Sequence, residues 1–190
     1  MEKCRNIGFL RKKLGNELFR HSMGVARMAA LLARTYGEDE NSAYLAGLWH
    51  DYAKPFSADY LKKKAVEFSL QPDKVTWHSP HLLHAPVGAI LVGRDAGIKD
   101  VQVLQAIKFH TTGKPGLGRF EHIIYLADAV EINRVYPGVR SLRKLAFNDL
   151  DGALLKVVDN AIKKVIRRGH LLHPYSTAFR NELLLKRKND

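Results

Sequence analysis

The chain has 190 residues, enough for one domain with a sizeable core but few for two. With 46% apolar residues it has the composition of an ordinary globular protein, and no apolar run is long enough to cross a bilayer. The net charge of +12 favours anionic partners, and the single cysteine, Cys4, excludes an internal disulfide. The basic N-terminus lacks the apolar stretch of an export signal, so we expect a cytoplasmic protein with no membrane partner.

Basic residues gather at the C-terminal end. Residues 156–190 hold nine Lys or Arg and three Asp or Glu. Aromatic side chains do not alternate with these charges, so the signal for nucleic acid as a partner is weak. We expect a solvated basic tail.

Helical periodicity runs through nearly the whole chain. The first expected helix covers residues 16–37, and the next begins with capping residues at 39 and ends at Pro55. Further helical patterns cover 57–68, 81–97, 100–113, 120–138 and 139–168, and a last helix follows Pro174. Residues 122–130, HIIYLADAV, are the one plausible strand and fit a helix equally well. The pattern predicts an all-α fold of seven to nine helices, forming a single domain over 1–190 with its core at about 15–185.

Two adjacent polar residues, His50 and Asp51, interrupt the apolar helix that ends at Pro55. Proline disfavours helical geometry at the residue before it, so the pair lies in or near the last turn, where the helix dipole favours a cation. Imidazole nitrogen and carboxylate oxygen are both ordinary ligands of transition metals. Taken alone, however, the pair is also explained by a buried histidine hydrogen-bonded to its neighbour.

Four other polar residues interrupt apolar segments in the same way. They are His21, His84, His110 and Asp128. An unpaired carboxylate buried among apolar residues costs several kcal/mol, so Asp128 needs a cation or strong donors. Together with His50 and Asp51, these residues predict a His/Asp metal centre. Such ligands suit iron, manganese, cobalt, nickel or zinc.

The other histidines are weaker candidates. His78, His81 and His84 are spaced three apart, and of these only His84 is kept as a site residue. We expect His122 at the surface. His170 and His173 fall in an expected loop and could contact an anion.

The ordered set His21, His50-Asp51 and Asp128 resembles the signature of the HD-domain metal-dependent phosphohydrolases. The stretches HSMGVARMAALLARTYG, AGLWHDYAK, LLHAPVGA, HTTG, LADAVEINRVYPGVRSLRKLA and HPYSTAFRN are similar to the YqeK-type subfamily of bacterial HD hydrolases. The resemblance covers about residues 15–185. It implies an HD-type helical bundle that hydrolyses diadenosine tetraphosphate symmetrically to two ADP at an iron-containing site.

The resemblance also implies roles for individual residues. His21, His50, Asp51 and Asp128 would hold a metal, and His84 and His110 would hold a second metal or contact phosphate. Asp51 and Lys54 would take part in catalysis. The residues implied in substrate binding are Lys54, Thr111, Arg134, His173, Pro174, Tyr175, Ser176, Thr177 and Ala178.

Several alternatives stay open at this point. Glu131 could orient a metal ligand or form an ion pair with Arg134, three residues further on. Whether the centre holds one metal or two, and whether the chain forms a homodimer, is also open. Two rival functions are a nucleotide phosphatase or phosphodiesterase of the same fold, and a non-catalytic module that binds RNA or the ribosome.

Overall fold

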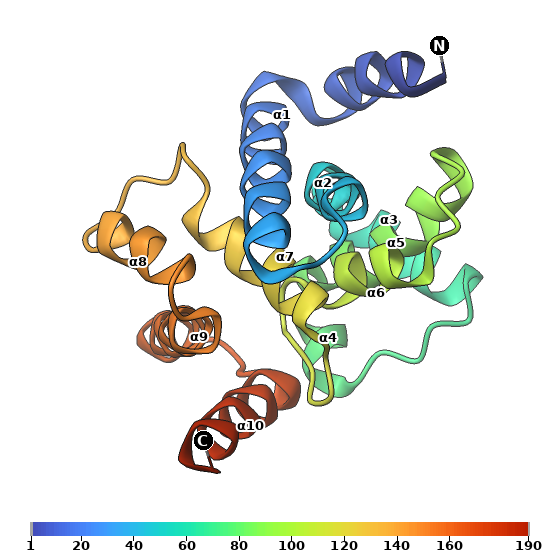
Figure 1. Cartoon of the computed structure of the whole chain (residues 1–190). Helices are drawn as coiled ribbons and strands as arrows, with labels where there is room; N and C mark the ends of the chain where they lie inside the picture. Colours follow the sequence, from blue (N-terminus) through green and yellow to red (C-terminus); the bar gives the residue numbers. More distant parts are fainter. Residues whose placement is uncertain (1, 190) are drawn as a thin grey trace.

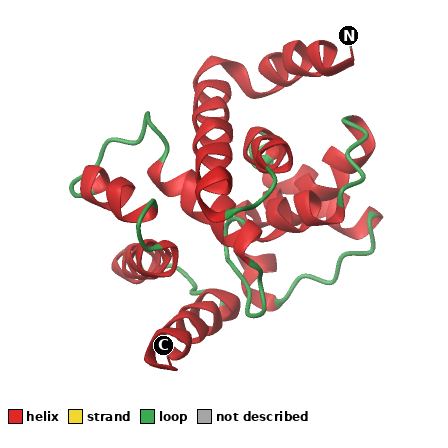
Figure 2. Cartoon of the chain, in the orientation of Figure 1, coloured by secondary structure: helices red, strands yellow, loops and turns green. Residues whose placement is uncertain are grey.

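The computed structural model describes residues 2–189, with side chains for 7–188. This part of the chain consists of helices joined by turns and loops and contains no strand, as Figure 1 and Figure 2 show. The elements in chain order are α1 (Glu2–Tyr36), α2 (Glu40–Trp49), α3 (Ala58–Glu67), α4 (Lys74–His78), the 3-10 helix η1 (Pro80–Leu83), α5 (His84–Asp95), α6 (Val101–Phe109), α7 (Arg119–Val130), α8 (Val139–Ala146), α9 (Leu150–Arg167) and α10 (Pro174–Asn189).

The all-α prediction is confirmed, but the expected seven to nine helices are too few. Residues 2–189 form ten α-helices and one 3-10 helix. The segment 139–168 divides into α8 and α9, because Asp149 accepts a hydrogen bond from the Gly152 N–H and starts a new helix there. A similar cap at Asp73 starts α4, a short helix that the sequence pattern did not indicate. The ambiguous stretch 122–130 lies in α7.

Helix α1 is bent at Gly15. This residue has a φ of +74°, which glycine adopts without the steric cost that a Cβ brings. The helical segment before Gly15 was not expected from its basic sequence. It is held by Leu10 and Leu14, which are buried. Figure 1 shows the two parts of α1 running in different directions.

Helices α1, α2, α5, α6 and α7 pack against one another and carry the candidate site. The backbones of α1 and α2 approach closely at Gly47, where a Cβ would lie 2.8 Å from the Cα of Ala26. This approach fixes how His21 on α1 faces His50 at the end of α2.

Helices α8, α9 and α10 pack in series beside α7, on one side of the molecule in Figure 1. Their buried residues, such as Val158, Phe179 and Leu183, join the same hydrophobic core as α1 and α2. No helix in the described part of the chain has the length and hydropathy needed to span a membrane.

Candidate metal centre

Asp51 lies at the centre of the site, between two pairs of histidines. Its side chain is 1% exposed, in the turn that follows α2. Oδ2 lies 3.2 Å from Nε2 of His50 and 3.8 Å from Nε2 of His21. Oδ1 lies 3.3 Å from Nε2 of His84 and 3.5 Å from Nε2 of His110. One carboxylate therefore faces two clusters that could each hold a cation, His21-His50-Asp51 and Asp51-His84-His110.

Asp128 closes the first cluster from α7. Its Oδ1 lies 3.0 Å from Nε2 of His21 and 3.9 Å from Nε2 of His50. The fold thus brings together all six residues that the sequence singled out. They are His21 on α1, His50 and Asp51 at the end of α2, His84 at the start of α5, His110 after α6 and Asp128 on α7.

Each histidine of the centre turns its Nδ1 away from the other ligands. Nδ1 of His50 donates to the carbonyl of Gly47 (2.7 Å), and His84 and His110 donate in the same way to the carbonyls three residues before them. Nδ1 of His21 donates to the carboxylate of Glu131 (3.2 Å). A carbonyl oxygen only accepts, so the proton lies on Nδ1 and the lone pair of Nε2 faces the centre. Such a bond from the outer nitrogen is the usual support of a metal-binding histidine.

The inward-facing atoms lack the partners that buried polar groups need. Nε2 of His21, Nε2 of His50 and Oδ1 of Asp51 are buried and have no hydrogen-bond partner among the residues that the structure describes. Nε2 of His84 and Nε2 of His110 lie 3.2 Å apart, with a lone pair on each. Unpartnered buried acceptors are costly, and a cation relieves all of them at once. The donor set therefore fits divalent transition metals.

The carboxylates of the centre stay ionised. Burial raises the pKa of Asp51. The charge of a protonated His50 and hydrogen bonds from protonated His110, His50 and His84 would hold this pKa well below its usual range, and a bound cation would act in the same direction in place of those protons. Burial likewise opposes ionisation of Asp128. Protonated His21 and His50, together with the guanidinium of Arg134, would hold the pKa of Asp128 below its usual range, and a bound cation would act in the same direction. Both carboxylates are thus ready ligands at neutral pH.

Glu131 supports His21 from a position that differs from the expected one. The helical pattern 120–138 predicts a helix that continues past residue 131, but α7 ends at Val130 and Glu131 is its C-cap, with a ψ of 160°. The residue is buried, and besides accepting from His21 it accepts a hydrogen bond from the Asn133 N–H (2.7 Å). Arg134 bonds instead to the carboxylate of Asp128 (2.6 Å). The geometry is that of an orienting residue and not of a Glu131–Arg134 ion pair.

Arg143 on α8 was not singled out from the sequence. Its guanidinium donates to the carbonyls of Val130 (2.6 Å) and Glu131 (2.8 Å) at the C-terminal end of α7. It thereby pins the turn that carries Glu131 and Arg134. A cation at a helix C-terminus is favourable, but the contact spans 13 residues and no local pattern marks it.

Two further predicted residues lie beside the ligands. Nζ of Lys54 is 2.7 Å from Oδ2 of Asp51, and its side chain is 48% exposed. This agrees with a lysine at the rim of the site. The hydroxyl of Thr111 lies 3.0 Å from Nε2 of His110 and 3.3 Å from Nε2 of His84. Gly113, the last residue of the helical pattern 100–113, has a φ of +63° and ends this turn.

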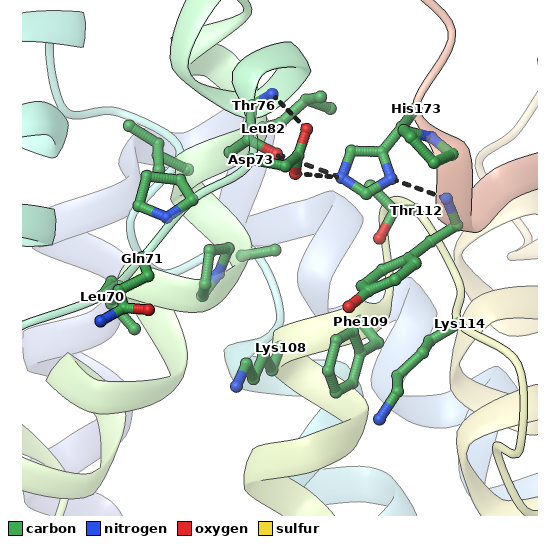
Figure 3. A pocket seen from close by; sticks show the side chains of 16 residues that line it. Leu70, Gln71, Asp73, Thr76, Leu82, Lys108, Phe109, Thr112, Lys114 and His173 are labelled. Carbon is green, nitrogen blue, oxygen red and sulfur yellow. Dashed lines mark hydrogen bonds and ion pairs between the residues drawn. The ribbon is translucent and has the colours of Figure 1, made fainter.

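The segment 173–178 lies next to this turn, and both ring nitrogens of His173 are hydrogen-bonded within the protein. Its Nε2 donates to Asp73 (2.9 Å), as Figure 3 shows. Its Nδ1 accepts from the Tyr175 N–H (3.0 Å). The hydroxyl of Ser176 donates to the carbonyl of Thr112. Thr177 is exposed. His173 and Ser176 therefore hold the segment in place.

The remaining histidines lie outside the centre. The expectation that His122 is at the surface is wrong. It is 5% exposed and packs against Phe179, from α10, with ring centroids 5.4 Å apart. His78 and His170 are exposed, and the carbonyl of His81 is the acceptor for Nδ1 of His84.

Comparisons with known proteins agree with this arrangement. The model of the HD domain family matches residues 18–133, a range that contains all six residues of the centre. A Halalkalibacterium halodurans protein named symmetrical bis(5'-nucleosyl)-tetraphosphatase is 37% identical over 99% of this chain and 100% of its own length. The Bacillus subtilis protein of the same name is 37% identical over 92% and 93%. A crystal structure from Clostridium acetobutylicum, described as a predicted HD superfamily hydrolase involved in NAD metabolism, is 38% identical, with a TM-score of 0.94 over 97% of each chain.

Proposed function

The chain belongs to the HD domain family, and we propose on this premise that it is a metal-dependent hydrolase that cleaves diadenosine tetraphosphate symmetrically to two ADP. The observation that carries the proposal is the position of Asp51. Its two oxygens face two histidine pairs whose Nε2 atoms point inward and lack enough hydrogen-bond donors. Three relatives support the choice of substrate. Each is named after this activity, and each is similar in sequence to this chain over most of its length.

We propose that His21, His50, Asp51 and Asp128 hold one metal ion. His84 and His110, with Asp51 shared, would hold a second ion or contact phosphate. A divalent cation held at this centre supplies Lewis-acid chemistry, lowering the pKa of water to about 7 and polarising a phosphoryl oxygen. Iron is our preferred cofactor, and manganese, cobalt, nickel or zinc would suit the same ligands.

The remaining polar groups around the centre match the charge of the substrate. A tetraphosphate is strongly anionic, and Lys54 and Arg134 place two cations beside Asp51 and Asp128. Arg134 can bind phosphate oxygens through two donors, whereas Lys54 acts as a point charge. The Thr111 hydroxyl can donate a hydrogen bond to a phosphoryl oxygen at the second histidine pair. Glu131 keeps His21 oriented.

The function is tested by following diadenosine tetraphosphate hydrolysis in the native protein, after removal of metal by a chelator, and after return of a single metal. We expect activity to disappear on chelation and to return with the metal. His50→Ala and Asp51→Ala should lose metal and nearly all turnover while helical content is kept. Full metal occupancy and turnover in either variant would contradict the proposed ligands.

A substrate panel and a measurement of RNA binding separate the rival functions. A nucleotide phosphatase or phosphodiesterase of this fold would prefer mononucleotides or cyclic nucleotides in a substrate panel. An RNA-binding module would bind RNA with a steep salt dependence that metal removal leaves unchanged. A cytoplasmic location and a homodimer stay predictions, and light scattering measures the latter.

A further inference from the structure

Two cavities adjoin the metal centre. One, of about 250 Å³, lies between the turn that carries Thr111 and residues 161–173 of α9 and the loop after it. The other, of about 310 Å³, lies between residues 54–61 and His84. We name them the α9 cavity and the α3 cavity. His81 lines both, so the two cavities adjoin each other as well as the centre.

Each cavity reaches the metal centre through a residue that touches the ligands. In the α9 cavity this residue is Thr111, whose hydroxyl lies 3.0 Å from Nε2 of His110. In the α3 cavity it is Lys54, whose Nζ lies 2.7 Å from Oδ2 of Asp51. A further cavity, of about 380 Å³ and drawn in Figure 3, is lined neither by a residue of the centre nor, among the described residues, by a side chain that bonds to one of its ligands.

The walls of both cavities suit an anionic ligand with apolar parts. Neither is lined by an Asp or a Glu among the described residues. The α9 cavity combines Lys164 and Arg168 with apolar side chains, and the α3 cavity combines Lys54 with Phe56 and Leu61. Pockets for drug-sized molecules usually measure about 300–1,000 Å³. At about 250 and 310 Å³ the two cavities lie near the lower end of this range, so each offers room for one nucleoside and the pair provides two separate binding sites.

We propose that the two cavities take the two nucleoside halves of one dinucleoside polyphosphate, with the phosphate chain passing His81 and the metal centre between them. This inference rests on the proposed function. Binding energy from the two nucleosides, which take no part in the reaction, would fix the register of the phosphate chain. Because both ends are held, the centre meets the middle of the chain, and the products are two equal halves.

An alanine lines each cavity and offers a matched pair of blocking variants. Ala58 is the exposed first residue of α3, and Ala161 is a partly exposed residue of α9. Ala58→Trp and Ala161→Trp fill one cavity each. Val66→Trp and Ile166→Trp are controls on the same two helices, at positions that are 67% and 61% exposed and line neither cavity.

The substrates to compare are diadenosine tetraphosphate and adenosine tetraphosphate, which carries one nucleoside only. Each blocking variant should lower kcat/KM for the dinucleotide by at least about tenfold, towards the native value for adenosine tetraphosphate. For adenosine tetraphosphate, kcat/KM of each single blocking variant should stay within about twofold of the native value, because the single adenosine can bind in the cavity that is still open. The double variant should lose both activities. Metal content and melting temperature should match those of the controls.

Two results would overturn the inference. One is a blocking variant that leaves dinucleotide hydrolysis at the level of its control. The other is a variant that lowers hydrolysis of both substrates by the same factor, since this would mean that one cavity holds the only nucleoside that is bound. Failure of the proposed function is distinguishable from either, because the native protein would then form no ADP from diadenosine tetraphosphate.

Discussion

Gly24 on α1 packs directly against the carboxylate of Glu131. A Cβ at Gly24 would lie 2.1 Å from Oε2 of Glu131, far inside any permitted contact. Gly24 is also one helical turn after His21, whose Nδ1 donates to the other oxygen of the same carboxylate. The glycine therefore provides the space in which Glu131 supports His21.

Substitution of Gly24 tests this support. Gly24→Ala should weaken metal binding about 10–100-fold, the usual effect of losing a partner that orients a ligand. The fold should survive, because alanine favours the helix and the displaced group is the end of a flexible side chain. Gly8→Ala is the control, since no atom of the described residues lies within 4 Å of its Cβ position. Metal titration measures the effect, and equal affinities in the two variants would contradict the role given to Glu131.

Lys54 gives a prediction for the phosphate contact. Lys54→Met keeps most of the stem and removes the charge that lies 2.7 Å from Asp51. Loss of a charge-assisted contact made in the transition state should cost about 2–4 kcal/mol, or roughly thirtyfold to a thousandfold in kcat/KM. Lys63→Met, at an exposed position of α3, is the control. If Lys54 is merely a solvated lysine, both variants will stay within about twofold of the native rate.

His110 decides between the two roles left open for the second histidine pair. If His84 and His110 hold a second metal, His110→Ala should halve the metal-to-protein ratio. If they contact phosphate, the ratio should stay constant while KM rises or kcat falls. Elemental analysis and steady-state kinetics of the same preparation separate these outcomes. A variant unchanged in both measurements would assign the pair to packing alone.

Stability should fall in acid because of His122. Burial lowers the pKa of this histidine from its ordinary value of 6.5, against an opposing effect of Asp151 and with a smaller lowering by Lys186. Asp151, Lys186 and Glu182 are the charged groups that act on it. The unfolded chain therefore binds the proton more readily, and the stabilising effect of the neutral ring is lost as the pH falls below about 6.5.

His122→Gln removes this titration. Denaturant unfolding at pH 7.5 and 5.5 should show a smaller loss of stability for the variant than for the native protein. A native-minus-variant difference that does not change with pH would contradict a lowered pKa.

The sequence was most informative where local chemistry determines the structure. Pro55 placed His50 and Asp51 at a helix end, and the helical pattern that stops at Gly113 matches the turn after His110. It was least informative where distant segments meet. His122 is buried by Phe179, 57 residues further along the chain. The carboxylate of Glu131 leaves no room for a Cβ at position 24, so a glycine is needed there. Such contacts leave no periodic signal. The break at Asp149 was missed because apolar spacing continues across it.

The products of diadenosine tetraphosphate hydrolysis test the central claim most directly. An early time course with the metal-loaded native protein should show ADP as the only adenine product, with two formed for each substrate consumed. AMP and ATP in equal amounts would mean that the outer phosphoanhydride is cleaved. Either that result or the absence of any product would contradict a symmetrical hydrolase centred on Asp51.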